Sequence, residues 1–137
     1  MIEEDFVKWE SGIRSEVDSV ELLLATTLSS EPSELISDLQ AIEAWNGRIN
    51  AALAQSDSFL DRYKLIAMPK KQDNWSETDR KLQMESDVAP IRLVRDTLEH
   101  LCDCIKIRIT LGQSILAFHR QFIETDIKLK KNNEKIW

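Results

Sequence analysis

Apolar residues recur every three or four positions along most of this chain, which is the period of an amphipathic α-helix. The first such stretch covers residues 3–27, and its apolar positions are Phe6, Trp9, Ile13, Val17, Val20 and Leu24. The pattern stops at Ser29, Ser30, Glu31 and Pro32. Serine is a favourable N-cap residue and proline is tolerated in a first helical turn, so we expect a second helix to begin there.

The second stretch, residues 31–67, repeats its apolar positions as a heptad seam for about four repeats. This seam consists of Leu35, Leu39, Ile42, Asn46, Ile49, Leu53, Ser56, Leu60 and Tyr63. A second apolar line on a neighbouring face consists of Trp45, Ala52 and Phe59. A helix that is apolar on two faces buries both of them, within its own chain or between chains. Asn46 is polar on the seam, where one asparagine often fixes the register and the oligomeric state.

Residues 68–75 show no apolar period, and we predict a loop there. Ser76, which is followed by acidic residues, then has the form of a helix N-cap with an acidic first turn. We expect this helix to run to about Val88, because Pro90 has no backbone N–H to donate and breaks or kinks a helix.

The last and longest stretch, residues 91–132, carries two apolar stripes. The first stripe is Leu98, Leu101, Ile105, Ile109, Gly112, Leu116, His119, Ile123 and Ile127. The second stripe is Cys104, Ile107, Leu111, Ile115, Phe118 and Phe122. Glycine within a helix costs about 1 kcal/mol relative to alanine, so Gly112 indicates a close approach of backbone at that point.

These patterns predict an all-α fold of three or four long amphipathic helices, arranged as a helical hairpin or coiled-coil bundle. We expect one domain over residues 1–137, with acidic helices over 1–60, a basic hairpin loop over 61–81 and a long helical region over 82–137. Helices with two apolar faces in so short a chain favour a homo-oligomer. The predicted oligomer interface is Leu98, Leu101, Ile105, Ile109, Gly112, Leu116, His119 and Ile123.

The composition excludes a disordered chain and a membrane protein. Hydrophobic residues make up 42% and charged residues 31% of the 137 residues. No window approaches the run of about 18 uncharged apolar residues that a membrane span needs. The acidic start is not followed by an apolar run, which is unlike a secretory signal. The two cysteines, Cys102 and Cys104, form no disulfide framework, so we expect a reducing compartment, the cytoplasm.

The sequence contains no recognisable catalytic or cofactor-binding motif. Neither a Walker-type loop nor a Gly-x-Gly-x-x-Gly loop is present. Cys102 and Cys104 are two residues apart, so on a helix they point about 200° from each other and cannot grip one tetrahedral ion. His119 lies on an apolar stripe with no evident nucleophile or orienting carboxylate. We therefore expect no enzyme, no cofactor and no metal site.

Charge divides the chain into two unequal halves. Residues 1–60 have a net charge of −9, whereas residues 61–137 have a net charge of +3. Basic groups and aromatic rings are interleaved between Arg62 and Lys81, and single-stranded DNA binding requires cations for the phosphates and rings for the bases. The candidate DNA-binding residues are Arg62, Tyr63, Lys64, Lys70, Lys71, Trp75, Arg80 and Lys81. A solvated hairpin loop is the alternative interpretation, and a second basic region over residues 104–137 is typical of a solvated helix face.

Three features follow one another along the chain. An acidic and apolar first helix contains Glu4-Asp5-Phe6, Trp9 and Val17-Asp18. The hairpin contains Asp61-Arg62-Tyr63-Lys64, and the last helix contains Arg108, Ile115, Phe118, Arg120 and Phe122. This order resembles the UvsY-type recombination mediators of large tailed phages, which are small helical proteins of similar length. The Tyr-Ser-Gly turn of the family hairpin is replaced here by Leu65-Ile66-Ala67-Met68-Pro69.

The resemblance implies a ring-like homo-oligomer that binds single-stranded DNA. Such a protein helps a RecA-like recombinase to load while it displaces a single-strand-binding protein, here in the host cytoplasm if the chain is phage-encoded. The resemblance also implies backbone contacts from Arg62, Lys64, Lys70 and Lys71, and base stacking on Tyr63. The residues alone leave a second hypothesis open, a helical protein-interaction factor without nucleic-acid binding. It could be a phage or bacterial assembly adaptor, or an inhibitor that uses its acidic half.

Overall fold

The computed structural model describes residues 4–67 and 76–136, and it describes side chains as far as residue 133. These ranges contain three helices: α1 (Glu4–Ala25), α2 (Pro32–Ala67) and α3 (Glu77–Ile136). No strand occurs in this part of the chain, so the predicted all-α fold is confirmed. The loop predicted over residues 68–75 lies outside the described residues.

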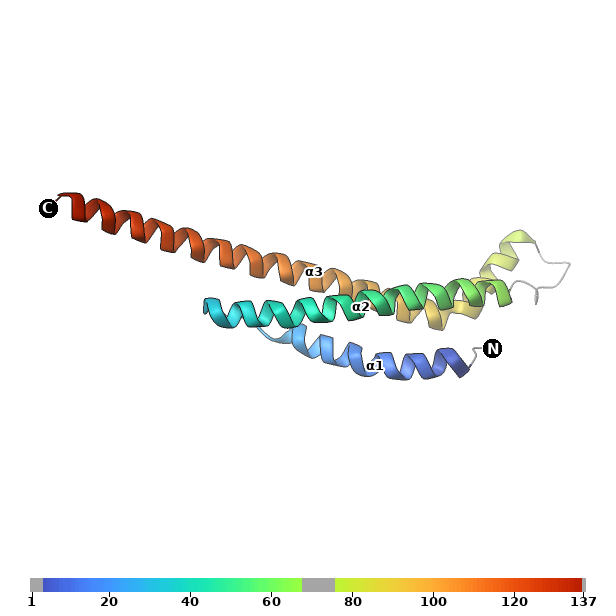
Figure 1. Ribbon diagram of the computed structural model, residues 1–137. Helices are drawn as coiled ribbons and strands as arrows, with labels where there is room; N and C mark the ends of the chain where they lie inside the picture. The colour runs from blue at the N-terminus through green and yellow to red at the C-terminus, as the bar shows by residue number, and fades with distance from the viewer. Residues whose placement is uncertain (1–3, 68–75, 137) are drawn as a thin grey trace.

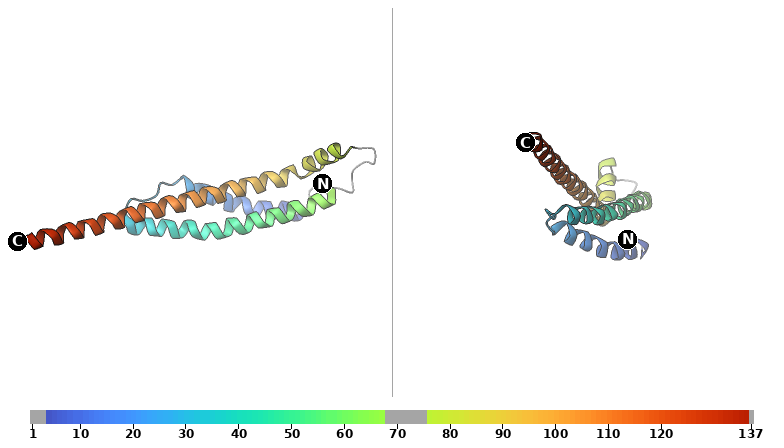
Figure 2. Two further views of the ribbon diagram at one scale, coloured as in Figure 1. Left: turned by 90° about the horizontal axis from the view of Figure 1, so that it is seen from above. Right: turned by 60° about the vertical axis from the view of Figure 1, so that its left-hand side comes forward.

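The three helices form an elongated bundle from which one helix projects. α2 and α3 make an antiparallel hairpin, and α1 lies alongside it (Figures 1 and 2). The 60 residues of α3 extend for about 90 Å, whereas the 36 residues of α2 extend for about 54 Å. α3 therefore continues past the start of α2, and its C-terminal part stands alone (Figure 1). Every residue from Arg120 to Asn133 is exposed, and we call residues 120–136 the α3 extension.

The heptad seam predicted on α2 is buried within the chain. Leu35 and Ile49 are fully buried on it, and the second line, with Ala52, meets α1. Ser56 is also buried, and its hydroxyl donates a hydrogen bond of 2.6 Å to the Leu53 carbonyl, so the polar seam position is satisfied. A middle cluster joins all three helices: Ile13, Val20, Ile42, Ile49, Ala52, Leu98, Leu101, Cys102 and Ile105. A second cluster lies nearer the end of α2: Phe6, Leu60, Tyr63, Val88 and Ile91.

The first stripe of α3 packs within the chain as well, and this makes part of the predicted oligomer interface wrong. The positions concerned are Leu98, Leu101, Ile105, Ile109 and Gly112. The first three are buried in the middle cluster and the fourth packs against it. Gly112 does have a close neighbour, but this neighbour is the Leu39 side chain of α2 and not another backbone, since an added Cβ would collide with Leu39 Cδ2. Of the remaining positions, Leu116 and His119 are half-buried and Ile123 is exposed.

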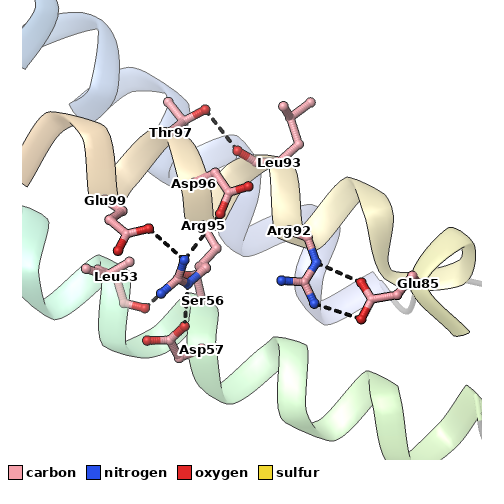
Figure 3. Close-up of polar contacts among 10 residues, drawn as sticks. All are labelled: Leu53, Ser56, Asp57, Glu85, Arg92, Leu93, Arg95, Asp96, Thr97 and Glu99. Carbon is pink, nitrogen blue, oxygen red and sulfur yellow. Dashed lines mark hydrogen bonds and ion pairs between the residues drawn. The ribbon is translucent and has the colours of Figure 1, made fainter. Parts of the chain in front are cut away.

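Of the break or kink predicted at Pro90, the break does not occur, because α3 continues through this residue. Proline inside a helix removes one backbone hydrogen bond and costs about 3 kcal/mol. Val88 and Ile91 on either side of it are buried in the second cluster. Arg92 also donates two hydrogen bonds, of 2.9 and 3.1 Å, to the Glu85 carboxylate across the proline (Figure 3). These contacts offset the cost, and α3 bends near its start instead of ending (Figure 2).

The N-cap of α2 is Glu31 and not one of the two serines before it. The Glu31 carboxylate accepts hydrogen bonds from the Ser33 hydroxyl and from the backbone N–H of Glu34, the latter at 2.8 Å. Both bonds favour the charged form, so they lower the pKa of Glu31. The cap predicted for α3 is confirmed, because the Ser76 hydroxyl accepts a hydrogen bond of 3.1 Å from the backbone N–H of Asp79.

Arg108 ties α1 to α3. Its guanidinium donates hydrogen bonds to the carbonyl oxygens of Leu24 and Thr26, the second at 3.0 Å. These oxygens lie at the C-terminal end of α1, where helix carbonyls have no partner within the helix and where a cation is favourable. One side chain of α3 therefore satisfies the end of α1 and sets its position along the bundle.

Candidate nucleic-acid interface

The described members of the predicted DNA site lie where α2 ends and α3 begins. They are Arg62, Tyr63 and Lys64 on α2, and Arg80 and Lys81 on α3. The two helix ends are adjacent, since Lys64 Nζ lies 3.9 Å from Glu85 Oε1. The other predicted members lie outside the described residues: Lys70, Lys71 and Trp75.

Tyr63 is not available to stack on a base in this structure. Its side chain is only 5% exposed and belongs to the second core cluster. Its ring meets the Phe6 ring edge to face, with 6.4 Å between ring centroids. The sequence could not reveal this, because the residue that covers Tyr63 comes from α1, more than fifty positions away. The role implied for Tyr63 by the family resemblance is therefore wrong for the folded bundle.

Three of the predicted cations have acidic neighbours in their own chain. Arg62 lies 3.9 Å from Asp5, and its guanidinium also lies over the Phe59 ring at 5.2 Å. Lys64 is near Glu85, as described above, and Lys81 lies 3.7 Å from Glu77. Exposed pairs of this length contribute about 0–1 kcal/mol, so a phosphate can displace the carboxylate. The hairpin end is consequently a weakly neutralised cation cluster and not a preformed DNA site.

The α3 extension is the second place where cations gather. Its described basic residues are Arg120, Lys128, Lys130 and Lys131, and all four are exposed. Lys130 pairs with Asp126 at 3.2 Å, and Glu124 is the other acidic residue in the described part of the extension. Arg120 and Lys131 are eleven residues apart, which is three helical turns or about 16 Å, so they project from the same side of α3. The sequence analysis identifies these cations as part of the basic region 104–137. The helical period of the sequence does not show, however, that this part of the helix extends beyond the bundle.

The second stripe of α3 is exposed over most of its length. Ile107 and Leu111 are 70% and 51% exposed, and they lie beside the bundle. Phe118 and Phe122 are 65% and 67% exposed, further toward the extension. Cys104 and Ile115 are half-buried, so the described side chains of the same chain cover the stripe only in part. The sequence signal for this exposed apolar surface is the presence of two apolar stripes on one helix.

An arginine network joins α2 to α3 away from these surfaces (Figure 3). Arg95 donates to Asp57 at 2.9 Å, to Asp96 at 3.2 Å and to Glu99 at 2.7 Å. The hydrogen bonds to the two aspartates and the nearby Glu99 charge raise the pKa of Arg95, which therefore stays charged. This cluster is part of the hairpin's structure, and its arginine is already saturated with carboxylates.

Two other features of the described residues bear on catalysis and metal binding, a cavity and the two cysteines. A cavity of about 470 Å³ lies between α1 and α2, beside Trp9, Arg48 and Gln55, and it opens to solvent. Within the described ranges, no group of three or more His, Cys, Asp or Glu side chains is placed to hold a metal ion. Cys102 is buried, and this burial raises the pKa of its thiol, whereas Cys104 is half-buried. None of the helices in these ranges is long and apolar enough to span a bilayer.

Comparisons with known proteins add no information on the function of these surfaces. No protein-family model, no curated protein and no solved structure matches this chain.

Proposed function

We propose that this chain is a non-enzymatic helical protein that binds single-stranded DNA as a homo-oligomer and assists the loading of a recombinase in the cytoplasm. The resemblance to UvsY-type mediators supports the recombination part of this proposal. The charge distribution supports the DNA part, because the acidic and the basic residues are gathered in different regions of the molecule.

The observation that carries the proposal is the lone basic helix of the α3 extension. It presents four described cations against two carboxylates, and neither of the other two described helices shields them. Cations along one helix side can follow a flexible phosphate backbone without reading its sequence. The cation cluster at the hairpin end, with Arg62, Arg80 and Lys81, supplies a second group of phosphate contacts.

The test is fluorescence anisotropy of a labelled single-stranded oligonucleotide, titrated with the protein at several salt concentrations. The charge-reversal variant Arg120→Glu/Lys131→Glu should weaken binding by about tenfold or more at low salt. Its slope of log affinity against log salt should be smaller by about 1.4, because each phosphate contact on a single strand contributes about 0.7. The matched control is Lys8→Glu/Arg14→Glu, which reverses two exposed cations on α1 and should leave binding unchanged. Equal losses from both variants would assign the effect to net charge and contradict the proposed site.

The second candidate function is a protein-interaction factor without DNA binding. It is favoured by the neutralised state of the predicted hairpin site, where Tyr63 is buried and Arg62, Lys64 and Lys81 face carboxylates. The net charge of −9 over residues 1–60 suits a basic protein partner. Absence of DNA binding at low salt by a folded wild-type chain would select this candidate over the first.

A further inference from the structure

The start of α1 covers two residues of the predicted DNA site on α2. The Asp5 carboxylate lies 3.9 Å from the Arg62 guanidinium. The next residue, Phe6, meets the Tyr63 ring edge to face, with 6.4 Å between ring centroids. Phe6 also meets the Phe59 ring edge to face, at 5.6 Å. Two consecutive residues of α1 thus place a negative charge beside Arg62 and an apolar ring against Tyr63.

One nucleotide of a single strand makes the same two kinds of contact. Its phosphate is attracted to a cation, and its base stacks on an aromatic ring or on a guanidinium plane. The Arg62 guanidinium is held over two rings, 5.2 Å from the Phe59 centroid and 5.5 Å from the Tyr63 centroid. The Arg62 side chain is 47% exposed, so a strand can reach it from solvent.

We propose that Phe59, Arg62 and Tyr63 form a nucleotide subsite for single-stranded DNA, which Asp5 and Phe6 occupy when no DNA is bound. Asp5 takes the position of the phosphate, and Phe6 takes the position of the base. A bound strand displaces the start of α1, which we define as residues 4–8. This inference rests on the DNA binding of the proposed function. It adds that the chain's own first helix regulates the hairpin end.

Only the start of α1 has to move. The first four backbone N–H groups of a helix have no partner within the helix, so helix starts open at low cost. Beyond this start, the Trp9 indole N–H donates a hydrogen bond of 2.8 Å to Gln55. The buried Ile13 and Val20 hold the middle of α1 in the bundle, and Arg108 holds its end. The rest of the helix therefore stays in place when its start withdraws.

The two occupants of the subsite compete with comparable strength. Phe6 is only 1% exposed, and burial of a phenylalanine side chain corresponds to a factor of about 10–150 in an equilibrium constant. Stacking of one base on an aromatic side chain corresponds to a factor of about 5–150. The exposed pair of Asp5 and Arg62 adds little, and a phosphate can replace it. A strand can therefore displace the start of α1, but the small fraction of open chains lowers its affinity for the subsite.

The first test compares strands with and without bases. Fluorescence anisotropy at low salt measures the affinity of each variant for an oligothymidylate and for an abasic strand of the same length. Phe6→Ala uncovers the subsite, so it should bind the oligothymidylate about tenfold more tightly than wild type does, and the abasic strand less than about twofold more tightly. Phe6→Leu keeps an apolar cover and should bind as wild type does. The matched control Val20→Ala shortens a buried side chain nearer the other end of α1 and should also bind as wild type does.

The outcomes separate the subsite from the proposed function. An equal gain by Phe6→Ala on both strands would assign the effect to charge or to a looser bundle, and would overturn the subsite. An unchanged or lower affinity of Phe6→Ala for the oligothymidylate would overturn it as well. If no variant and no wild-type chain bound either strand, the proposed function itself would be contradicted, and the subsite with it.

The second test uses the wild-type chain, so it does not depend on the folding of a core variant. In an α-helix that begins at residue 4, the backbone N–H groups of residues 8–10 donate to the carbonyls of residues 4–6, and they exchange with solvent when this start opens. A saturating oligothymidylate should speed their hydrogen exchange by about tenfold or more and leave residues 17–25 unchanged. The abasic strand should change neither segment. Unchanged or slower exchange at residues 8–10 with bound oligothymidylate would overturn the proposal.

Discussion

Gly112 gives the sharpest test of how closely α3 packs on α2. A Cβ at this position would lie 3.0 Å from Leu39 Cδ1 and closer still to Leu39 Cδ2. Carbon atoms in ordinary contact are about 3.5–4.0 Å apart, so Leu39 would have to retreat by about 1 Å or more. Leu39 is only 6% exposed, and its retreat would press on the residues behind it.

The size of the effect follows from two opposing terms. Replacing a helical glycine by alanine stabilises a helix by about 1 kcal/mol. Overpacking a well-filled site costs about 1–3 kcal/mol. Gly112→Ala should therefore lower the free energy of unfolding by about 0–2 kcal/mol. In a Leu39→Ala background the obstacle is gone, so the same change should stabilise by about 1 kcal/mol. The coupling between the two positions should be about 1–3 kcal/mol.

The assay is urea unfolding followed by circular dichroism at one fixed protein concentration, for wild type, both single variants and the double variant. Gly47→Ala is the matched control, because nothing lies within 4 Å of a Cβ added to that glycine of α2. It should stabilise the chain by about 1 kcal/mol. If Gly112→Ala stabilises wild type as much as Gly47→Ala does, the close approach of α2 and α3 is refuted.

Three further predictions concern the helix ends. Arg108→Met should lower stability by about 1–2 kcal/mol and speed hydrogen exchange in α1, because it removes two charge-assisted hydrogen bonds; unchanged exchange there would contradict the tie between α1 and α3. The pKa of Glu31 is lowered by folding, so its contribution is present above the unfolded pKa of about 4.3 and is lost as the pH falls through the lowered value. Glu31→Gln should thus lower the melting temperature at pH near 7 and converge with wild type in acid, and a gap that persists in acid would refute the cap. Ser76→Ala should cost about 1 kcal/mol in thermal unfolding, whereas no change would mean that the α3 cap is unimportant.

Much of the fold can be predicted because helical periodicity is a local property. Residues 3–27 and 31–67 were expected to be helical, and the helices cover Glu4–Ala25 and Pro32–Ala67. The break expected at Pro90 failed for a non-local reason. The core contacts that hold α3 together there come from Leu60 and Tyr63 of α2, in addition to the Arg92–Glu85 pair within α3 itself. The contribution of Leu60 and Tyr63 cannot be read from the sequence around the proline.

The candidate site is harder to predict, because an apolar stripe in the sequence does not identify the helix or the molecule that packs against it. Both stripes of α3 read as apolar, and the first was assigned to an oligomer although α1 and α2 bury it. The same limit applies to Tyr63, whose aromatic ring fits a core as well as a base stack. The apolar pattern of α3 does not show where α2, its partner in the hairpin, stops covering it. α2 is too short to reach the α3 extension, and this difference in length exposes the cations of the extension and the end of the second stripe of α3.

The central claim is that a dimer or larger oligomer of this chain holds single-stranded DNA. The most direct measurement is sedimentation velocity of a labelled single-stranded oligonucleotide, detected by its fluorescence, in the presence of the full-length chain at low salt. The account predicts that the oligonucleotide moves with a particle that contains at least two chains, and that high salt releases it. An oligonucleotide that sediments at its free rate, while the chain itself is folded, would contradict the account.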